Sequence, residues 1–390
     1  MAKIKNKEAE EEENSIISPE KQLLSYLKTN KDDHLNFEKE INYKVSSGSL
    51  NLDIELGGGI RPGIIRFTGC TESGKTSCAL SFMSNFLKSV PNSRGIYIKS
   101  EGRFDIEVQE RADFEFVSDA EAWKNGNCFI YKSNIYESVI ALIRTLVNNN
   151  PNEVKYFFII DSMDALISMG DLEKGCDQAM KVAGNALLSS DFMRRIALRL
   201  GTLGHIGALV SQVRSTVQIN VYAKPDPKIT NASGGSALLH FSNWLLEAQQ
   251  RFNKDIIWAG EEGKSERLGH YCSIVFRKTP NEKTGTVVKY PIRYGQKNGK
   301  SIWRSLEVAD QMLAFEFMIK AGAWINLSEG LAKELKENKI PHQEKFNGIK
   351  AFHKFLDETP AFVDYMYNKF KSVLLGSEEA NQNIELTEGL

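Results

Sequence analysis

The chain has 390 residues, of which 42% are hydrophobic and 25% charged, and its formal net charge is −1. This composition allows one large globular domain or a few smaller ones, and any polyanionic partner must be bound by local basic patches. The charged first residues (MAKIKNKEAEEEEN) lack the apolar stretch of a signal peptide, so none is expected there, and no apolar run is long enough to predict a membrane span. The five cysteines and six histidines show no disulfide or metal-ligand spacing. We therefore expect no membrane association and no zinc.

Residues 1–41 are expected to form a disordered tail followed by a helix. Lysines and then a run of glutamates fill the tail. Ser18 and Pro19 are typical of an N-cap and a first helical position. The helix over 19–30 carries leucines at helical spacing, namely Leu23, Leu24 and Leu27. It is either a local cover or an arm that docks on a neighbouring subunit.

The segment from Gly69 to Thr76 matches the pattern G-x-x-x-x-G-K-[ST] of a phosphate-binding loop. A short apolar strand, Ile64 to Thr68, precedes it, and a helix, Ser77 to Lys88, follows it. Backbone N–H groups and a helix N-terminus hold phosphate in this context, and the alternative is a turn that binds nothing. Lys75 would reach the β- and γ-phosphates of ATP and Thr76 would hold Mg²⁺. The residues assigned to ATP here are Gly69, Cys70, Thr71, Glu72, Ser73, Gly74, Lys75, Thr76 and Ser77.

Strand-like and helical runs alternate across a core of about 42–294. This alternation predicts an α/β fold with a mostly parallel central sheet and helices on both faces. Residues 295–375 are predicted to be a small, helical C-terminal domain, and 376–390 an acidic tail. The predicted strands are Ile64–Thr68, Gly95–Ser100, Asn127–Tyr131, Tyr156–Ile160, Ile206–Ser211, Trp244–Ala248 and Tyr271–Phe276; the clearest helices are Tyr136–Asn148 and Asp191–Leu200.

Three predicted strands end in polar side chains, at Glu101, Asp161 and Gln212. Ligands bind outside the carboxyl ends of strands in an open parallel sheet. Asp161 is placed on the Mg²⁺ side, Glu101 as the base for the attacking water, and Gln212 as a hydrogen-bond donor to the γ-phosphate. The alternatives are a helix cap for Asp161, an exposed strand-end glutamate for Glu101 and a turn residue for Gln212.

Two long segments follow these strand ends, around Met169 to Asn185 and over residues 213–235, and from Leu172 to His240 eight Lys/Arg stand against four Asp/Glu. Loops of this length inside a compact domain are usually functional or disordered. Their position predicts an ATP-gated contact with a polyanion, although ordinary surface loops with a mild basic excess remain the alternative.

Ordered blocks across residues 45–325 resemble the RecA recombinase family. They are SGSLNLDIELGGG (47–59), the phosphate loop, Glu101 with Asp105, Asp161-Ser162, Ser211-Gln212-Val213-Arg214, Ser233 to Leu238, Tyr294-Gly295 and Lys320 to Trp324. The resemblance implies a RecA-like ATPase core, in a chain of bacterial or phage origin acting in the cytoplasm.

The resemblance also implies roles for individual residues. Asp105 and Tyr294 would contact adenine, and Lys75, Glu101 and Gln212 would act in hydrolysis. Arg277 and Lys278 would approach the ATP of the adjacent subunit; Thr279 stands where a second lysine is usual, so Lys278 or Lys283 would substitute. Cys70-Thr71 replaces the usual proline-glutamate pair. The implied DNA-binding residues are Lys181, Arg214, Ser233, Gly234, Gly235 and Ser236.

These residues together predict a DNA-dependent ATPase that uses ATP and Mg²⁺. It would form a helical homo-oligomeric filament on single-stranded DNA, with ATP at subunit interfaces, and exchange strands with homologous double-stranded DNA. Single-strand-binding and loader proteins are expected partners. Two alternatives stay open: a hexameric DNA helicase on the same core, and an ATP-binding recombination mediator. An ATPase assay with and without single-stranded DNA separates both enzymes from the mediator.

Overall fold

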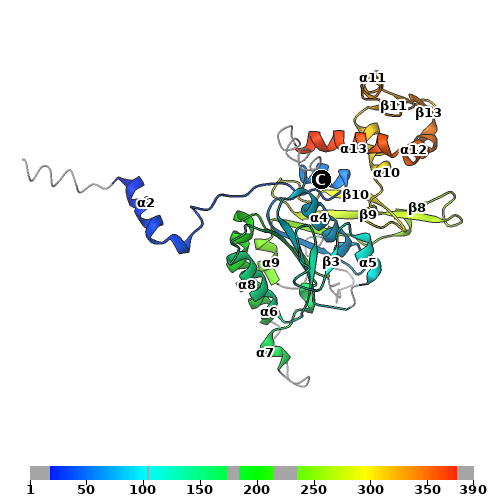
Figure 1. Cartoon of the computed structure of the whole chain (residues 1–390). Coiled ribbons are helices and arrows are strands. Elements are labelled where there is room, and N and C mark those ends of the chain that lie inside the picture. The colour runs from blue at the N-terminus through cyan, green and yellow to red at the C-terminus, as the bar shows by residue number, and fades with distance from the viewer. Residues whose placement is uncertain (1–17, 103–104, 174–183, 214–234, 376–390) are drawn as a thin grey trace, which may run out of the picture.

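The computed structural model describes residues 18–102, 105–173, 184–213 and 235–375. Its main body is a 10-stranded sheet with the path β10-β9-β7-β1-β6-β5-β2-β4-β3, while β8 pairs with β9 (Figure 1). The strands are β1 Gly63–Gly69, β2 Ser93–Lys99, β3 Phe116–Val117, β4 Cys128–Lys132, β5 Lys155–Asp161, β6 Ile206–Val210, β7 Trp244–Ala248, β8 Ile256–Trp258, β9 Arg267–Lys278 and β10 Val287–Arg293.

The strand directions confirm the predicted mostly parallel α/β sheet. From β7 through β1, β6, β5, β2 and β4 to β3, every neighbouring pair is parallel. Antiparallel strands β9 and β10 extend the β7 side. The carboxyl ends of β1, β6, β5 and β2 therefore share one edge of the sheet, which is where such sheets bind ligands.

Alternation along the strands sends apolar side chains to both faces of the sheet. Helix α4 (Lys75–Ser89) covers one face, where Phe82 and Phe86 are fully buried. Helices α6 (Tyr136–Asn148) and α8 (Gly184–Thr202) cover the other face, as Figure 1 shows. The remaining helices of the body are α3 Leu50–Leu56, α5 Ile106–Arg111, α7 Met169–Leu172 and α9 Gly235–Phe241, with 3₁₀ turns η1 Lys31–Asp33, η2 Met163–Ala165 and η3 Asn253–Asp255.

The C-terminal unit has its own apolar core, built around Met312, Phe352 and Phe362. The prediction of a helical region was incomplete, because the unit also contains a 3-stranded antiparallel sheet in the order β11-β12-β13. These strands are only three or four residues long, so the sequence offers little alternation by which to recognise them. The elements are α10 Arg304–Ala314, β11 Met318–Ala321, β12 Trp324–Leu327, α11 Glu329–Glu337, β13 Lys345–Asn347, α12 Gly348–Glu358 and α13 Pro360–Leu375.

A buried polar contact ties this unit to the main body. Ser49 caps the N-terminus of α3, and its hydroxyl also donates to the Glu307 carboxylate on α10. Leu50 N donates to the same carboxylate at 3.1 Å. Burial raises the pKa of Glu307 to about 8, so its protonation state depends on pH near neutrality.

The N-terminal helix α2 (Pro19–Thr29) forms as predicted, with Ser18 as its N-cap and proline in its first turn. Figure 1 shows it projecting away from the main body, and none of its residues is buried. The predicted tails at 1–14 and 376–390 lie outside the described residues.

Candidate nucleotide-binding site

The loop between β1 and α4 has the backbone of a phosphate cradle. Glu72 and Gly74 adopt left-handed conformations, with φ of 59° and 95°, so the backbone turns sharply before α4. Gly69 is required at the strand end, because an added Cβ would lie 2.3 Å from the Ala248 carbonyl oxygen. The nine predicted ATP-binding residues, 69–77, are thus one continuous loop and first helical turn, a geometry that presents N–H groups to phosphate.

Lys75 lies at the start of α4 and folds back over this loop. Its Nζ donates to the Cys70 carbonyl oxygen at 2.5 Å, and Ser73 Oγ donates to the same oxygen at 2.8 Å. Burial lowers the pKa of Lys75, and nearby carboxylates, Asp161 foremost, oppose that shift. A lysine held by a neutral carbonyl can turn to a phosphate oxygen without breaking an ion pair.

Asp161 ends β5 and faces Thr76 across the edge of the sheet. The Thr76 hydroxyl donates to Asp161 Oδ2 at 2.7 Å. A hydroxyl and a carboxylate beside bound phosphates are oxygen ligands of the kind that Mg²⁺ takes, few in number because this ion keeps several waters. Among the described residues no group of three or more His, Cys, Asp or Glu side chains is placed to hold a metal.

Tyr97 is a polar partner of this site that sequence reasoning missed. Its hydroxyl donates to Asp161 Oδ2 at 2.7 Å, the same oxygen that Thr76 uses. Burial raises the pKa of Tyr97 far above its ordinary value, so the phenol remains a donor. A tyrosine among aliphatic residues in a buried strand, four positions before Glu101, was the available signal.

Strand order ranks the three strand-end side chains by their closeness to the phosphate loop. β6 is the neighbour of β1, β5 comes next and β2 follows, so Gln212 is one strand away and Glu101 three. Val213 N donates to the Gly69 carbonyl oxygen at 3.1 Å, which ties the end of β6 to the loop. Both Gln212 and Glu101 are exposed, as groups that meet a ligand must be.

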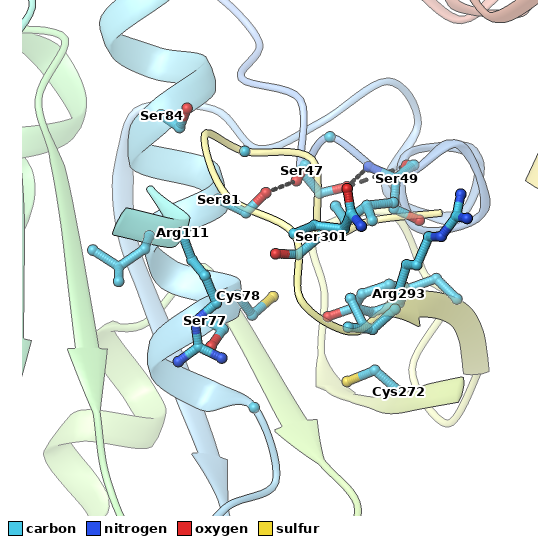
Figure 2. A pocket seen from close by; sticks show the side chains of 18 of the residues that line it. Ser47, Ser49, Ser77, Cys78, Ser81, Ser84, Arg111, Cys272, Arg293 and Ser301 are labelled. Atoms are coloured by element: carbon cyan, nitrogen blue, oxygen red, sulfur yellow. Dashed lines mark hydrogen bonds between the residues drawn. The ribbon is translucent and has the colours of Figure 1, made fainter. Parts of the chain in front are cut away.

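A cavity of about 290 Å³ continues from the phosphate loop along α4. Glu72 and Gly74 border it at the loop, and Tyr294 and Gly295 border it after β10. Figure 2 shows Ser77 and Cys78 of α4 on one side and Cys272 and Arg293 on the other. The structure therefore brings Tyr294 beside the loop, while Asp105, at the N-cap of α5, is not among the lining residues.

Arg277 and Lys278 are the last two residues of β9, five and six positions beyond Cys272, whose Sγ is 3.8 Å from the Ser73 carbonyl oxygen. Six strand residues correspond to about 20 Å. Arg277 is paired with Glu247 at 2.7 Å, and Lys278 donates to the Leu239 and His240 carbonyl oxygens at the end of α9. Lys283 pairs with Glu55 at 2.9 Å. All three cations thus have partners within their own chain.

Most of the predicted DNA-binding residues cannot be placed. Lys181, Arg214, Ser233 and Gly234 lie outside the described residues, and only the backbone of Gly235 and Ser236 is placed, in the first turn of α9. The segment 213–235 therefore starts at the strand end that carries Gln212 and returns to the helical layer at α9. In the part of the chain that the structure describes, no helix is long and apolar enough to cross a membrane.

A phosphate loop between a central parallel strand and its helix, with an acidic residue ending a nearby strand, is the arrangement of the P-loop class of folds. Comparison with known proteins gives the family, because the RecA N-terminal domain matches residues 32–268. The chain belongs to the RecA family and is a recombination and repair protein of the RecA type.

Its relatives have low sequence identity, but the similarity covers most of the length of both chains. The mitochondrial DNA repair protein recA homolog 3 of Arabidopsis thaliana is 22% identical over 87% of this chain and 70% of its own length. Protein RecA of Crocosphaera subtropica is 22% identical over 85% and 84%. Protein RecA of Campylobacter fetus is 23% identical over 79% and 83%.

Proposed function

We propose that this protein is an ATP-dependent recombinase that forms a helical filament on single-stranded DNA and pairs it with homologous duplex. The observation that carries the proposal is the shared edge of β1, β6 and β5. There the phosphate loop, Asp161 and Gln212 lie on adjacent strands, and Gln212 stands at the root of the segment 213–235. A nucleotide bound at this edge would contact the start of the DNA-binding segment.

Hydrolysis would use groups from both sides of the loop. Lys75 stabilises the charge that develops on the γ-phosphate, and Glu101 accepts a proton from the attacking water. Thr76 and Asp161 would hold Mg²⁺, which neutralises phosphate charge when bound. Tyr294 would lie against the adenine in the cavity beside α4, and Asp105, outside the lining of that cavity, would have to move toward the base to contact it.

Arg277 would act on the nucleotide of the adjacent subunit. Its place toward the far end of β9 supports this role over contact with its own chain's loop. Release from Glu247 would be part of the step, because their ion pair occupies the guanidinium in the single chain. Lys278 is the weaker candidate for contact with the neighbouring nucleotide. It donates to the last carbonyl oxygens of α9, and the C-terminus of a helix already favours a cation there.

The N-terminal helix supports assembly into a filament. Leu23 is 59% exposed and Tyr26 63% exposed, an apolar surface that a neighbouring copy would cover. Head-to-tail contact of this kind repeats without closing when the rotation between subunits is helical. ATP between subunits would then stabilise the assembly.

DNA would be bound through its phosphates by residues of the two segments and of the first turn of α9: Lys181, Arg214, Ser233, Gly234, Gly235 and Ser236. Contacts to phosphate leave the base edges free for pairing with a homologous strand, and they make affinity sequence-independent and salt-dependent. Single-strand-binding and loader proteins would compete for, or deliver, the same strand.

The test is electron microscopy of the purified protein on single-stranded DNA with a slowly hydrolysed ATP analogue. Extended helical filaments that require both DNA and nucleotide support the proposal. Closed rings would point to a helicase, and bare DNA to an accessory protein. Strand exchange between homologous but not heterologous DNA, measured on the same preparation, then tests the recombinase activity itself.

A further inference from the structure

A buried arginine lies within the strand that leads to the phosphate loop. Arg66 is 2% exposed in the middle of β1. Its neighbours Ile65 and Phe67 belong to the apolar cluster under α4, whereas Ile64 belongs to the cluster under α6 and α8. Because side chains alternate along a strand, Arg66 points to the α8 side. A buried guanidinium is costly unless it is paired and hydrogen-bonded, so its partners indicate its role.

Those partners belong to the γ-phosphate side of the site. Arg66 donates from Nε and from Nη2 to Ser211 Oγ, both at 3.2 Å. Ser211 is fully buried and immediately precedes Gln212. Burial lowers the pKa of Arg66 to about 10, and the carboxylate of Asp164 opposes that shift. Arg66 therefore remains a cation at neutral pH, between the end of β6 and Asp164.

The backbone around Gln212 is fixed at three consecutive positions. Ser211 N donates to the Phe67 carbonyl oxygen at 2.9 Å, and Val213 N donates to that of Gly69 at 3.1 Å. Between them, Gln212 N donates to Asp164 Oδ2 at 2.5 Å. The Gln212 side chain is nevertheless exposed. The backbone of Gln212 is thus held in place, while its side-chain amide is exposed at the edge where the γ-phosphate would lie.

Asp164 links the backbone of Gln212 to the end of β5, where Asp161 lies. It lies three residues after Asp161, in the 3₁₀ turn η2 that follows β5. That turn is closed by Ala165 N donating to the Ser162 carbonyl oxygen at 3.3 Å, and Ser162 is fully buried. The carboxylate that holds Gln212 therefore moves with the residue that would face Mg²⁺.

We propose that Arg66 and Asp164 are positioning residues that couple the nucleotide state to the segment 213–235 by fixing the backbone of Gln212. The inference rests on the proposed function, in which Gln212 reports the γ-phosphate to the DNA-binding segment. The Gln212 side chain can respond to the loss of the γ-phosphate only if the Gln212 backbone stays in place while the side chain moves. Arg66 anchors one side of Gln212 through Ser211, and Asp164 holds its amide directly.

The test compares DNA affinity with a slowly hydrolysed ATP analogue and with ADP, for the wild type and for Asp164→Ala, Ser211→Ala and Arg66→Met. We expect the ratio of the two affinities to fall about tenfold in Asp164→Ala and Arg66→Met, a size common for coupling between sites. Affinity for a fluorescent ATP analogue should change little, because none of these side chains contacts the loop's phosphate-binding groups. Ser211→Ala should show a smaller loss.

Asp164→Asn provides the conservative comparison. It keeps an oxygen that can accept from Gln212 N but removes the charge near Arg66, so it should recover part of the coupling lost in Asp164→Ala. A wild-type affinity ratio in Asp164→Ala overturns the proposal. If Arg66→Met does not fold, the Asp164 and Ser211 variants, which leave the arginine in place, decide the question.

A matched control separates positioning from general damage. Arg94 on β2 is a partly buried arginine that lies over the Trp123 ring at 5.1 Å, away from β6. Arg94→Met should retain the wild-type affinity ratio even if it lowers thermal stability; an equal loss of coupling would make the effect structural and overturn the inference. If the wild type itself shows no difference between the two nucleotides, the proposed function fails instead.

Discussion

Two regions of the molecule differ in how much of their surface is packed within a single chain. One is the phosphate edge, meaning the carboxyl ends of β1, β6 and β5 with the loop 69–77, and the other is the N-terminal helix α2. At the phosphate edge, Ser73 is 7% exposed and Lys75 8% exposed, and both bond to the Cys70 carbonyl oxygen. In α2 no residue is buried, and Leu23 and Tyr26 are mostly exposed. The side chains at this edge are packed and hydrogen-bonded within one chain, whereas the helix leaves its apolar side chains in water.

This difference separates binding from assembly. A preorganised loop needs little rearrangement to hold a phosphate, so nucleotide binding can be a property of the single chain. An exposed apolar surface gains free energy only when another surface covers it, so α2 acts through a second copy. Variants of the two regions should therefore fail in different assays.

The largest effect is expected at the phosphate edge. Lys75→Ala should lower the ATPase rate at least about 100-fold, because a buried charge that stabilises the transferring phosphate is removed. Steady-state ATPase assays with single-stranded DNA measure this. Lys333→Ala, at an exposed position of helix α11, is the matched control and should keep its rate; normal activity in Lys75→Ala would remove the loop from the site.

The second effect is expected in α2. Leu23→Asp combined with Leu24→Asp should abolish DNA-dependent filaments, since charges replace the surface that a neighbour would cover. The free energy of unfolding should change by less than about 0.5 kcal/mol, because both side chains are exposed. Sedimentation measures assembly and chemical denaturation measures stability. Lys28→Asp changes charge on the same helix without removing apolar surface, and filaments lost equally in that control would contradict the role of the leucines.

A smaller effect is expected at Tyr97. Tyr97→Phe removes the hydrogen bond to Asp161 and should raise the Mg²⁺ concentration needed for half-maximal hydrolysis about tenfold, as outer partners of metal ligands do. ATPase assays across a Mg²⁺ series measure this, with Tyr131→Phe on β4 as the control. An unchanged Mg²⁺ requirement would show that Asp161 is oriented without Tyr97.

The last effect is on stability and leaves the nucleotide site untouched: it concerns Glu307, which joins the C-terminal unit to the body inside one chain. Its folded pKa of about 8 lies above the ordinary value of 4.5, so the folded state binds more protons between these values. Stability from this group is therefore present at low pH and lost as pH rises toward 8, by up to about 1.4 kcal/mol per pH unit. Glu307→Gln should flatten that slope in chemical denaturation, and exposed Glu329→Gln should not. An unaltered slope in Glu307→Gln would place the titration elsewhere.

Local patterns were sufficient for the elements that surround the phosphate loop. The strand before it, helix α4 and the strand ending at Asp161 were each predicted, with boundary shifts of one or two residues. Helix α6 and strand β7 have the predicted boundaries. In these segments apolar runs of strand length or helical spacing are bounded by glycines or polar caps, so neighbouring residues alone determine the element.

The sequence by itself determined the phosphate loop, the strand-end residues and the alternation that makes a parallel α/β sheet, because each depends on residues close together in the chain. Only the tertiary structure decided that Tyr97 and Thr76 donate to the same oxygen of Asp161. It also decided that Arg66 bonds to Ser211, that Asp164 accepts from Gln212 N, and that Glu307 accepts from the first N–H groups of α3. These contacts join residues 48 to 258 positions apart in the chain. Strand order, burial and long-range pairing arise when the chain packs, and no local pattern encodes them.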